Sequence, residues 1–102
     1  MNTNVKTRMG GQEMVDLCKK HTFFSWSAQN AVNPIPWSKA EGIYFWDTEG
    51  KRYTDLSSQL ASTNLGYGNQ HDIEAIQAKA ENIAYGGHTM VTQVRAEHGE
   101  KM

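Results

Sequence analysis

The segment Glu41–Gly68, EGIYFWDTEGKRYTDLSSQLASTNLGYG, carries the pattern that decides the fold. Ile43–Trp46 combines a β-branched residue with three aromatic residues, which favours a strand. Asp47–Gly50 contains turn-forming residues and ends in a glycine, which accepts a positive φ. The chain returns through Arg52–Leu56, so this segment predicts a β-hairpin. A small, polar stretch then leads to a second turn at Leu65–Gly68.

Helices are predicted on both sides of this segment. Met14, Leu17 and Cys18 recur at i, i+3 and i+4, so Gly11–His21 presents one apolar helical face. A second helix is expected from about Asp72 to Ala84, where isoleucines and an alanine repeat with helical spacing. Both helices are short and need a surface to dock on.

The segment between the first helix and the hairpin has no steady period. Phe23–Trp37 contains two prolines two residues apart, and residues before proline avoid the α region. We expect an irregular, ordered strap that lays its aromatic side chains on another surface. The last segment, His88–Met102, begins with β-prone residues and ends with charged ones. We expect a helix to start in its charged part.

Composition limits both the size of the core and the kinds of partner. The 102 residues include three tryptophans, four tyrosines and three phenylalanines, and the formal net charge is −1. One small domain fits this length, and balanced charge gives no basis for nucleic-acid or membrane binding. The single cysteine, Cys18, fits a reducing compartment. Residues 1–14 contain no apolar run of signal-peptide length, so we expect a cytoplasmic protein.

Metal binding and thiol chemistry are the first chemical alternatives. Cys18 and His21 have plausible ligand spacing, and His71, His88 and His98 could add imidazoles. No second tight pair of ligands follows, so exposed or capping histidines are the simpler interpretation. Cys18 lies on the apolar face of its helix, where a buried, inert thiol is more common than a nucleophile.

Phosphate binding and paired carboxylates are two further alternatives. Gly66-Tyr67-Gly68 precedes a helix, a position that favours anions, but its spacing matches neither a P-loop nor a dinucleotide motif. The glycines are better explained by a tight turn. The carboxylates Asp47 and Glu49 lie in a turn, where solvation is the simpler interpretation.

The order of these elements resembles the N-terminal region of class III (omega) pyridoxal-phosphate (PLP) aminotransferases. The matching residues are His21–Phe24, then Ala40–Asp47 with Glu49–Tyr53 and Asp55, then Asn64–Gly68 and the helix that Asp72 opens. The similarity runs from about residue 13 to the end of the chain. The resemblance implies an α+β fragment with an N-terminal helix, an aromatic strap, a β-hairpin and one helix, as in the small N-terminal part of fold type I PLP enzymes.

The resemblance also implies an activity for the full-length family. Its members are homodimers in which a lysine holds PLP as an imine. They move an amino group from an amine or amino acid to a 2-oxo acid such as pyruvate. For the domain organisation, we expect residues 1–10 to be a disordered tail. Residues 11–102 are expected to be the first segment of the small domain, ending before the large domain that binds PLP.

By position in the family, the resemblance implies that Phe23, Leu60 and Ala61 line the substrate pocket. Many amine-specific members carry a bulky aromatic residue where Ala61 stands, so the pocket is expected to be more open here, or the substrate different. The residues at the second turn, Tyr67, Asn69 and Gln70, are more similar to the amine-transferring subgroup than to the ornithine-type one.

The cofactor-binding motifs of the family are not found in these 102 residues. Lys39, Lys51 and Lys79 do not match the motif of the imine-forming lysine, and the phosphate loop is also missing. We therefore expect no catalytic, cofactor-binding or metal-binding residue in this fragment, no bound PLP and no turnover by the isolated chain.

Two alternative hypotheses remain open. The ten aromatic residues exceed what a thin aliphatic core can cover, which favours a non-catalytic interaction module that docks on a partner or on a full-length paralogue. The scattered histidines leave a small metal-binding protein as a more remote alternative.

Overall fold

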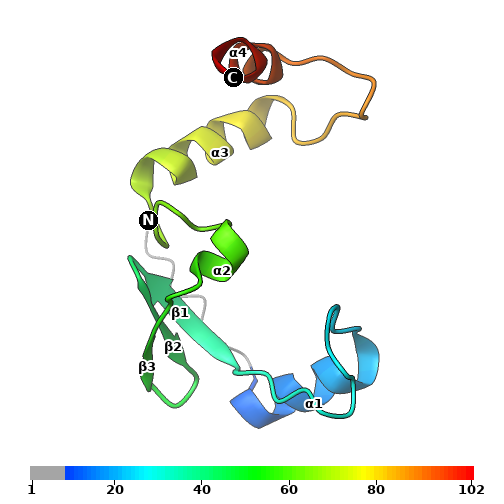
Figure 1. The fold of residues 1–102 in the computed structure, drawn as a ribbon, viewed down its shortest axis with the longest axis vertical. Helices are drawn as coiled ribbons and strands as arrows, with labels where there is room; N and C mark the ends of the chain where they lie inside the picture. The colour runs from blue at the N-terminus through cyan, green and yellow to red at the C-terminus, as the bar shows by residue number, and fades with distance from the viewer. Residues whose placement is uncertain (1–8) are drawn as a thin grey trace. The chain divides into compact units, whose positions relative to one another are not determined.

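The computed structural model describes residues 9–102 and divides the chain into two units, Met1–Asn69 and Gln70–Met102 (Figure 1). Residues 1–8, which make up most of the predicted tail, lie outside the described residues. The elements are α1 (Gly11–His21), β1 (Trp37–Glu41), β2 (Tyr44–Asp47), β3 (Arg52–Thr54), α2 (Ser58–Ala61), α3 (Gln70–Asn82) and α4 (Gln93–Lys101).

Helix α1 has the bounds that its apolar spacing predicted. An acidic residue lies in the first turn and basic residues lie in the last, as the helix dipole favours. The helix ends at Thr22, whose backbone N–H and hydroxyl both donate to the carbonyl of Cys18, at 2.9 and 2.7 Å. The local sequence therefore determines both the position and the end of this helix.

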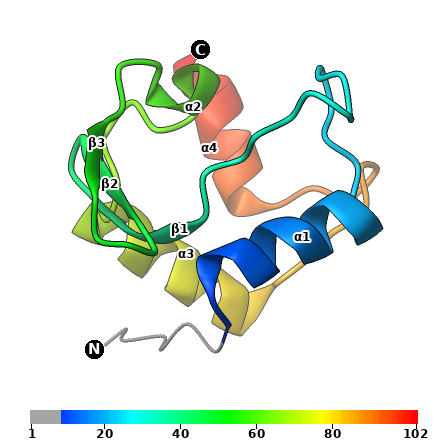
Figure 2. The same ribbon diagram turned by 90° about the horizontal axis from the view of Figure 1, so that it is seen from below.

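The strap between α1 and the sheet is irregular, as predicted. Gln29 holds its first turn, because its side chain accepts from the N–H of Phe24 at 3.0 Å and donates to the carbonyl of the same residue. Phe23 and Trp26 are 80% and 91% exposed. Figure 2 shows the strap leaving α1 and returning to the start of β1. Within the first unit, these two aromatic side chains therefore have no surface that covers them.

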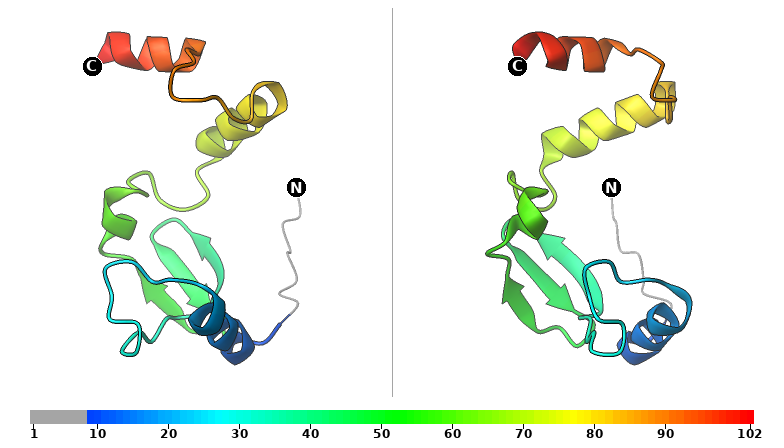
Figure 3. Two further views of the ribbon diagram at one scale, coloured as in Figure 1. Left: turned by 90° about the vertical axis from the view of Figure 1, so that its right-hand side faces the viewer. Right: turned by 45° about the vertical axis from the view of Figure 1, so that its right-hand side comes forward.

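The sheet contains three antiparallel strands in the order β1-β2-β3 (Figure 3). The predicted hairpin is its β2-β3 half, in which Phe45 lies opposite Tyr53. The sequence does not predict strand β1, whose first residue, Trp37, is the last residue of the predicted strap. Its sequence, WSKAE, lacks β-branched residues, and its register shifts between Trp37 and Lys39. An irregular, mostly exposed edge strand leaves no alternating apolar pattern to detect.

The core of the sheet is a row of stacked aromatic rings. Phe45 is 8% exposed and stacks between Trp37 and Tyr53, with ring centroids 4.4 and 5.0 Å apart. Tyr67 meets the edge of the Trp37 ring at 5.7 Å. This row crosses all three strands, so aromatic stacking replaces the aliphatic core that the composition lacks.

The other face of the sheet carries cations over aromatic rings. Lys39 lies 4.3 Å from the centre of the Trp46 ring, and the Arg52 guanidinium lies 4.5 Å from the centre of the Tyr44 ring. Lys39 and Arg52 are exposed, whereas the two rings are half-buried. This face therefore holds its aromatic residues under solvated charges.

The second unit consists of α3, α4 and their connection. Helix α3 covers most of the predicted range from Asp72 to Ala84, but it begins and ends two residues earlier. The predicted terminal helix is α4, which Thr92 caps by accepting from the N–H of Arg95 at 3.3 Å. Within residues 9–102, no helix is long and apolar enough to cross a membrane.

Candidate functional site

The hairpin turn is organised around the carboxylate of Asp47. One carboxylate oxygen accepts from the backbone N–H groups of Glu49 and Lys51, at 3.0 and 2.9 Å, and the other accepts from the Tyr53 hydroxyl at 3.0 Å. Asp47 is 8% exposed, so the expectation of a solvated turn carboxylate is wrong for this residue. Burial opposes its ionisation, but the three hydrogen bonds outweigh burial and lower the pKa of Asp47.

The second turn is attached to the hairpin through its backbone. Gly42 and Tyr67 exchange two hydrogen bonds, at 2.9 and 2.7 Å, and form an antiparallel bridge. Gly66 has φ +81°, and a Cβ at this position would lie 2.9 Å from the carbonyl oxygen of Gly42. A glycine is therefore required at position 66 for both backbone conformation and space.

Asp55 connects the end of the hairpin to this second turn. One of its carboxylate oxygens accepts from the N–H and hydroxyl of Ser57, at 2.9 and 3.0 Å. The other accepts from the Tyr67 hydroxyl at 2.5 Å and from the Gln59 amide at 3.3 Å. Four donors from three separate positions therefore converge on one carboxylate.

The ionisation of this pair follows from the contacts. The hydrogen bond from Tyr67, together with those from Ser57 and Gln59, lowers the pKa of Asp55 to about 2. For Tyr67, partial burial and the adjacent Asp55 carboxylate raise the pKa of the phenol. Asp55 is therefore ionised and Tyr67 protonated at neutral pH, which is the arrangement that maintains their hydrogen bond.

The segment that Asp55 holds has an unusual backbone. All four residues of α2, Ser58–Ala61, have positive φ values, between 47° and 63°. Gln59 and Leu60 also have the ψ values of a left-handed helix, 57° and 47°. None of the four is a glycine, and this conformation costs a non-glycine residue about 1–2 kcal/mol. We call Ser58–Ala61 the left-handed turn.

The structure places the predicted substrate-pocket residues on two separate segments. Phe23 follows the end of α1, whereas Leu60 and Ala61 form the second half of the left-handed turn. All three are exposed, and Leu60 is 73% exposed. None of them lines the cavity between α1, the strap and the hairpin turn. Their role at a substrate pocket remains a prediction.

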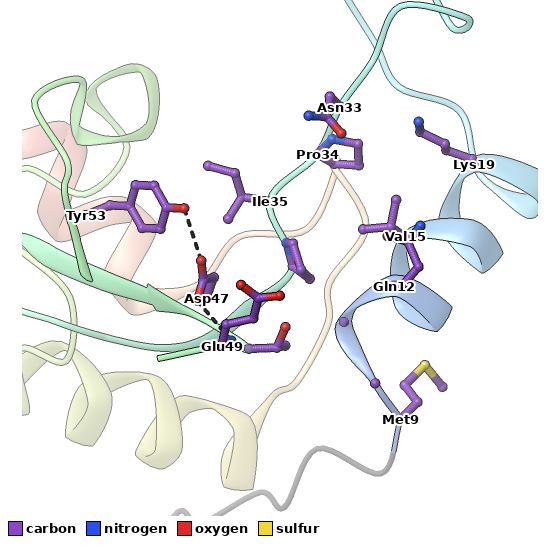
Figure 4. Close-up of a pocket in the computed structure, with 14 residues that line it drawn as sticks. Met9, Gln12, Val15, Lys19, Asn33, Pro34, Ile35, Asp47, Glu49 and Tyr53 are labelled. Atoms are coloured by element: carbon purple, nitrogen blue, oxygen red, sulfur yellow. Dashed lines mark hydrogen bonds between the residues drawn. The ribbon is translucent and has the colours of Figure 1, made fainter. Parts of the chain in front are cut away.

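A cavity of about 500 Å³ lies between α1, the strap and the hairpin turn (Figure 4). Gln12 and Lys19 of α1 and Asp47 and Glu49 of the turn are among the residues that line it. Helix α1 approaches the turn closely, because a Cβ on Gly11 would overlap the hydroxyl of Thr48. Among the lining residues that the structure describes, two are carboxylates and one is a lysine.

The metal and thiol alternatives gain no geometric support. Among the described residues, no three histidine, cysteine, aspartate or glutamate side chains lie close enough to hold a metal ion. Cys18 is half-buried and lines a second pocket together with Met14, Phe24 and Trp37.

The segments that form the hairpin and the two turns after it also match known proteins. The family model for class-III aminotransferases matches residues 26–101. This chain belongs to the class-III aminotransferase family. The match includes the hairpin, the left-handed turn and the Gly-Tyr-Gly turn.

Curated relatives are similar over most of the chain. Acetylornithine aminotransferase of Archaeoglobus fulgidus is 30% identical over 84 residues, which cover 82% of this chain and 21% of that protein. The 2-aminoadipate transaminase of Pseudomonas putida is 41% identical over 54 residues, covering 53% and 13%. The chain therefore spans about a fifth or less of the length of these relatives.

Solved structures share the fold. Taurine:2-oxoglutarate aminotransferase from Bifidobacterium kashiwanohense, in complex with PLP and glutamate, superposes with a TM-score of 0.79 and 34% identity, over 90% of this chain and 20% of that one. An S-selective transaminase from Arthrobacter sp. with alanine bound gives a TM-score of 0.72 and 27% identity, over 88% and 20%. The expected fold, the N-terminal part of a PLP transaminase, is confirmed.

The residues described here do not fit PLP by themselves. The cofactor's phosphate needs cationic groups or several free backbone N–H donors. The cavity beside the hairpin turn presents Asp47 and Glu49, which repel a phosphate, and among residues 9–102 its lining cation is Lys19. The N–H groups of Glu49 and Lys51 already donate to Asp47. Among residues 9–102, this cavity therefore provides no phosphate site for PLP.

The sequence identifies the segment Glu41–Gly68 but not the side chains that organise it. Asp55 belongs to the family motif, and the motif gives it no structural role. An aspartate followed two residues later by serine is typical of an Asx turn, so its bond to Ser57 was detectable. Its bond to Tyr67, twelve residues away, needs the tertiary structure.

Proposed function

We propose that this chain forms the N-terminal part of a class III aminotransferase. In the complete protein, PLP would provide the electron sink for moving an amino group from an amine or amino acid to a 2-oxo acid such as pyruvate. We also propose that the complete protein is a homodimer in the cytoplasm. The observation that carries it is the superposition of 90% of this chain on taurine:2-oxoglutarate aminotransferase at 34% identity.

Within that protein, this chain contributes to the substrate side of the pocket. Phe23, Leu60 and Ala61 are the residues assigned to this role. Two observations support the assignment: all three side chains are exposed here, and Leu60 and Ala61 lie on a strained backbone segment. Strained residues concentrate at functional sites, because the surrounding structure must hold them in place. The small side chain of Ala61 leaves space for a bulky amine substituent.

PLP is held by another part of the protein in this proposal. The isolated 102-residue chain should neither bind the cofactor nor transfer amino groups. The test is to add PLP, reduce with borohydride and search for a phosphopyridoxyl lysine by mass spectrometry. A lysine of this chain labelled in stoichiometric amount would contradict this part of the proposal.

Activity can be tested by a chimera of taurine:2-oxoglutarate aminotransferase. In the chimera, the matching fifth of that enzyme is replaced by residues 9–102 of this chain. The chimera should bind PLP and transfer an amino group to a 2-oxo acid, whereas the same enzyme lacking the segment should not. A correctly folded chimera that binds PLP but transfers no amino group from any amine or amino acid tested would contradict the proposal.

An interaction module is the second candidate function. It is favoured by the exposed aromatic residues, among which Trp26 is 91% and Tyr85 88% exposed. Contiguous apolar patches mark contacts with other proteins, and in this hypothesis each of these side chains belongs to such a contact in the complex. The hypothesis predicts a defined complex in size-exclusion chromatography when the chain is mixed with a full-length class III aminotransferase. A molten, aggregating chain that forms no such complex would count against it.

A further inference from the structure

We propose that Asp55 and Tyr67 are positioning residues that hold the left-handed turn, Ser58–Ala61, in the conformation that selects the substrate. This inference rests on the proposed function, because it assigns Leu60 and Ala61 to the substrate pocket. It goes beyond that function by naming the two residues that determine the conformation of this part of the pocket.

The first step is that the backbone conformation of the left-handed turn is energetically unfavourable by itself. Four successive non-glycine residues have positive φ values, a region that L-residues adopt singly and at a cost. Such backbone persists only where contacts around it hold it. Leu60 is 73% exposed and Ala61 is also exposed, so side-chain packing within the first unit does not provide those contacts.

The second step is that hydrogen bonds with the flanking residues provide them, and the N–H of Ala61 also donates to the carbonyl of Ser57 at 3.2 Å. Asp55 fixes the entry by accepting from Ser57 and binds the turn itself through Gln59. The exit is fixed by the carbonyl of Ser58, which accepts from the N–H groups of Ser62 and Thr63 at 2.8 and 3.0 Å. The turn is therefore constrained at both ends.

The third step is that Tyr67 fixes Asp55. Its hydroxyl donates to the carboxylate, and its backbone is anchored to the sheet by the bridge to Gly42. Its ring also contacts Trp37, which belongs to the stacked core. Tyr67 therefore connects the rigid sheet to the carboxylate, and the carboxylate connects to the turn.

The structure offers a matched control for this arrangement. Tyr53 donates to the carboxylate of Asp47 in the hairpin turn at 3.0 Å, so it also forms a tyrosine–aspartate pair. The carboxylate of that pair accepts from Glu49 and Lys51 of the hairpin turn, whereas Asp55 accepts from Ser57 and Gln59. Tyr53→Phe removes the same chemical group as Tyr67→Phe but leaves the left-handed turn untouched.

The first measurement uses the 102-residue chain and the φ-dependent NMR couplings of residues 58–61. Wild type and Tyr53→Phe should show positive φ values at these residues, whereas Tyr67→Phe and Asp55→Asn should lose them. Adding Ser58→Gly to Tyr67→Phe should restore the turn, because glycine accepts positive φ without a Cβ penalty. A turn that remains left-handed in both Tyr67→Phe and Asp55→Asn would overturn the inference.

The second measurement uses the chimera and compares kcat/KM for taurine with that for the bulkier 1-phenylethylamine. Tyr67→Phe should change the ratio of the two values by about tenfold, the effect of losing a hydrogen bond to a charged group, and Tyr53→Phe should not. Equal loss for both amines in the two variants would indicate a purely structural role and overturn the inference. An inactive parent chimera would instead count against the proposed function, while the NMR result still decides the conformational part.

Discussion

At the residue scale, two carboxylates with similar surroundings have different tasks. Asp47 closes the hairpin turn, and Asp55 joins the hairpin to the segments that follow. Both accept a hydrogen bond from a tyrosine hydroxyl and from backbone N–H groups. The sequence predicts a solvated Asp47 and assigns Asp55 no structural role, because the tyrosine that pairs with each carboxylate is brought to it by the fold.

The acid sensitivity of the chain should depend on Asp55. Its pKa is lowered from 3.8 to about 2, with the Tyr67 hydrogen bond as the largest cause. A lowered pKa in the folded state means that the stabilisation is complete above about pH 4 and is lost as the pH falls toward 2. Carbon-13 NMR of the Asp55 carboxyl should show this low pKa. In Tyr67→Phe the pKa should move toward its ordinary value, and an unchanged pKa there would contradict the assignment.

Gly66 should tolerate no side chain. A Cβ would lie 2.9 Å from the Gly42 carbonyl oxygen, and the residue has φ +81°. Gly66→Ala should weaken the Gly42–Tyr67 bridge by about 1–3 kcal/mol, measured from hydrogen exchange of the two bridge amides. Gly50→Ala has a similar φ, +86°, but open space, so it isolates the backbone cost. Equal exchange in the two variants would show that the close approach is unimportant.

At the element scale, the accuracy of the sequence predictions follows the strength of the local signal. Helix α1 and the β2-β3 hairpin have clear periodicity and turn residues, and both were predicted. Strand β1 lacks an alternating pattern and pairs along only one edge. The left-handed turn, Ser58–Ala61, contains no glycine, which is the residue that normally signals positive φ. Its conformation depends on Asp55 and Tyr67, so no local pattern could predict it.

The stacked aromatic row should account for most of the stability of the sheet. Phe45→Ala removes the middle ring and should lower the free energy of unfolding by about 3–5 kcal/mol, as for other buried phenylalanines. Phe23→Ala removes the same side chain from a site that is 80% exposed and should change the free energy by less than about 0.5 kcal/mol. Urea unfolding of the 102-residue chain, followed by tryptophan fluorescence, measures both. Similar values for the two variants would contradict this account of the core.

At the scale of the whole molecule, the family was evident from the sequence, whereas the pocket was not. The motif from Glu41 to Gly68 is long and ordered enough to indicate class III aminotransferases, and the family match agrees. The three pocket residues came from resemblance alone. In the proposed longer protein, residues outside this chain share the pocket, so the local sequence cannot define it.

The side chain at position 61 should control which amines are accepted. Ala61→Trp in the chimera should lower kcat/KM for 1-phenylethylamine by at least about tenfold relative to taurine, because a bulky ring would fill the proposed space. Leu65→Trp is a suitable control, since it adds the same ring four residues beyond the turn at a position that is 70% exposed. An equal effect of the two substitutions on both amines would argue against a pocket role for Ala61.

The most direct test is a crystal structure of the chimera with PLP and a bound amine substrate. The account predicts that residues 58–61 keep positive φ values and that Leu60 and Ala61 contact the substituent of the amine. It also predicts that PLP is held by residues outside this chain. A structure in which Phe23, Leu60 and Ala61 all face bulk solvent, away from the substrate, would contradict the account.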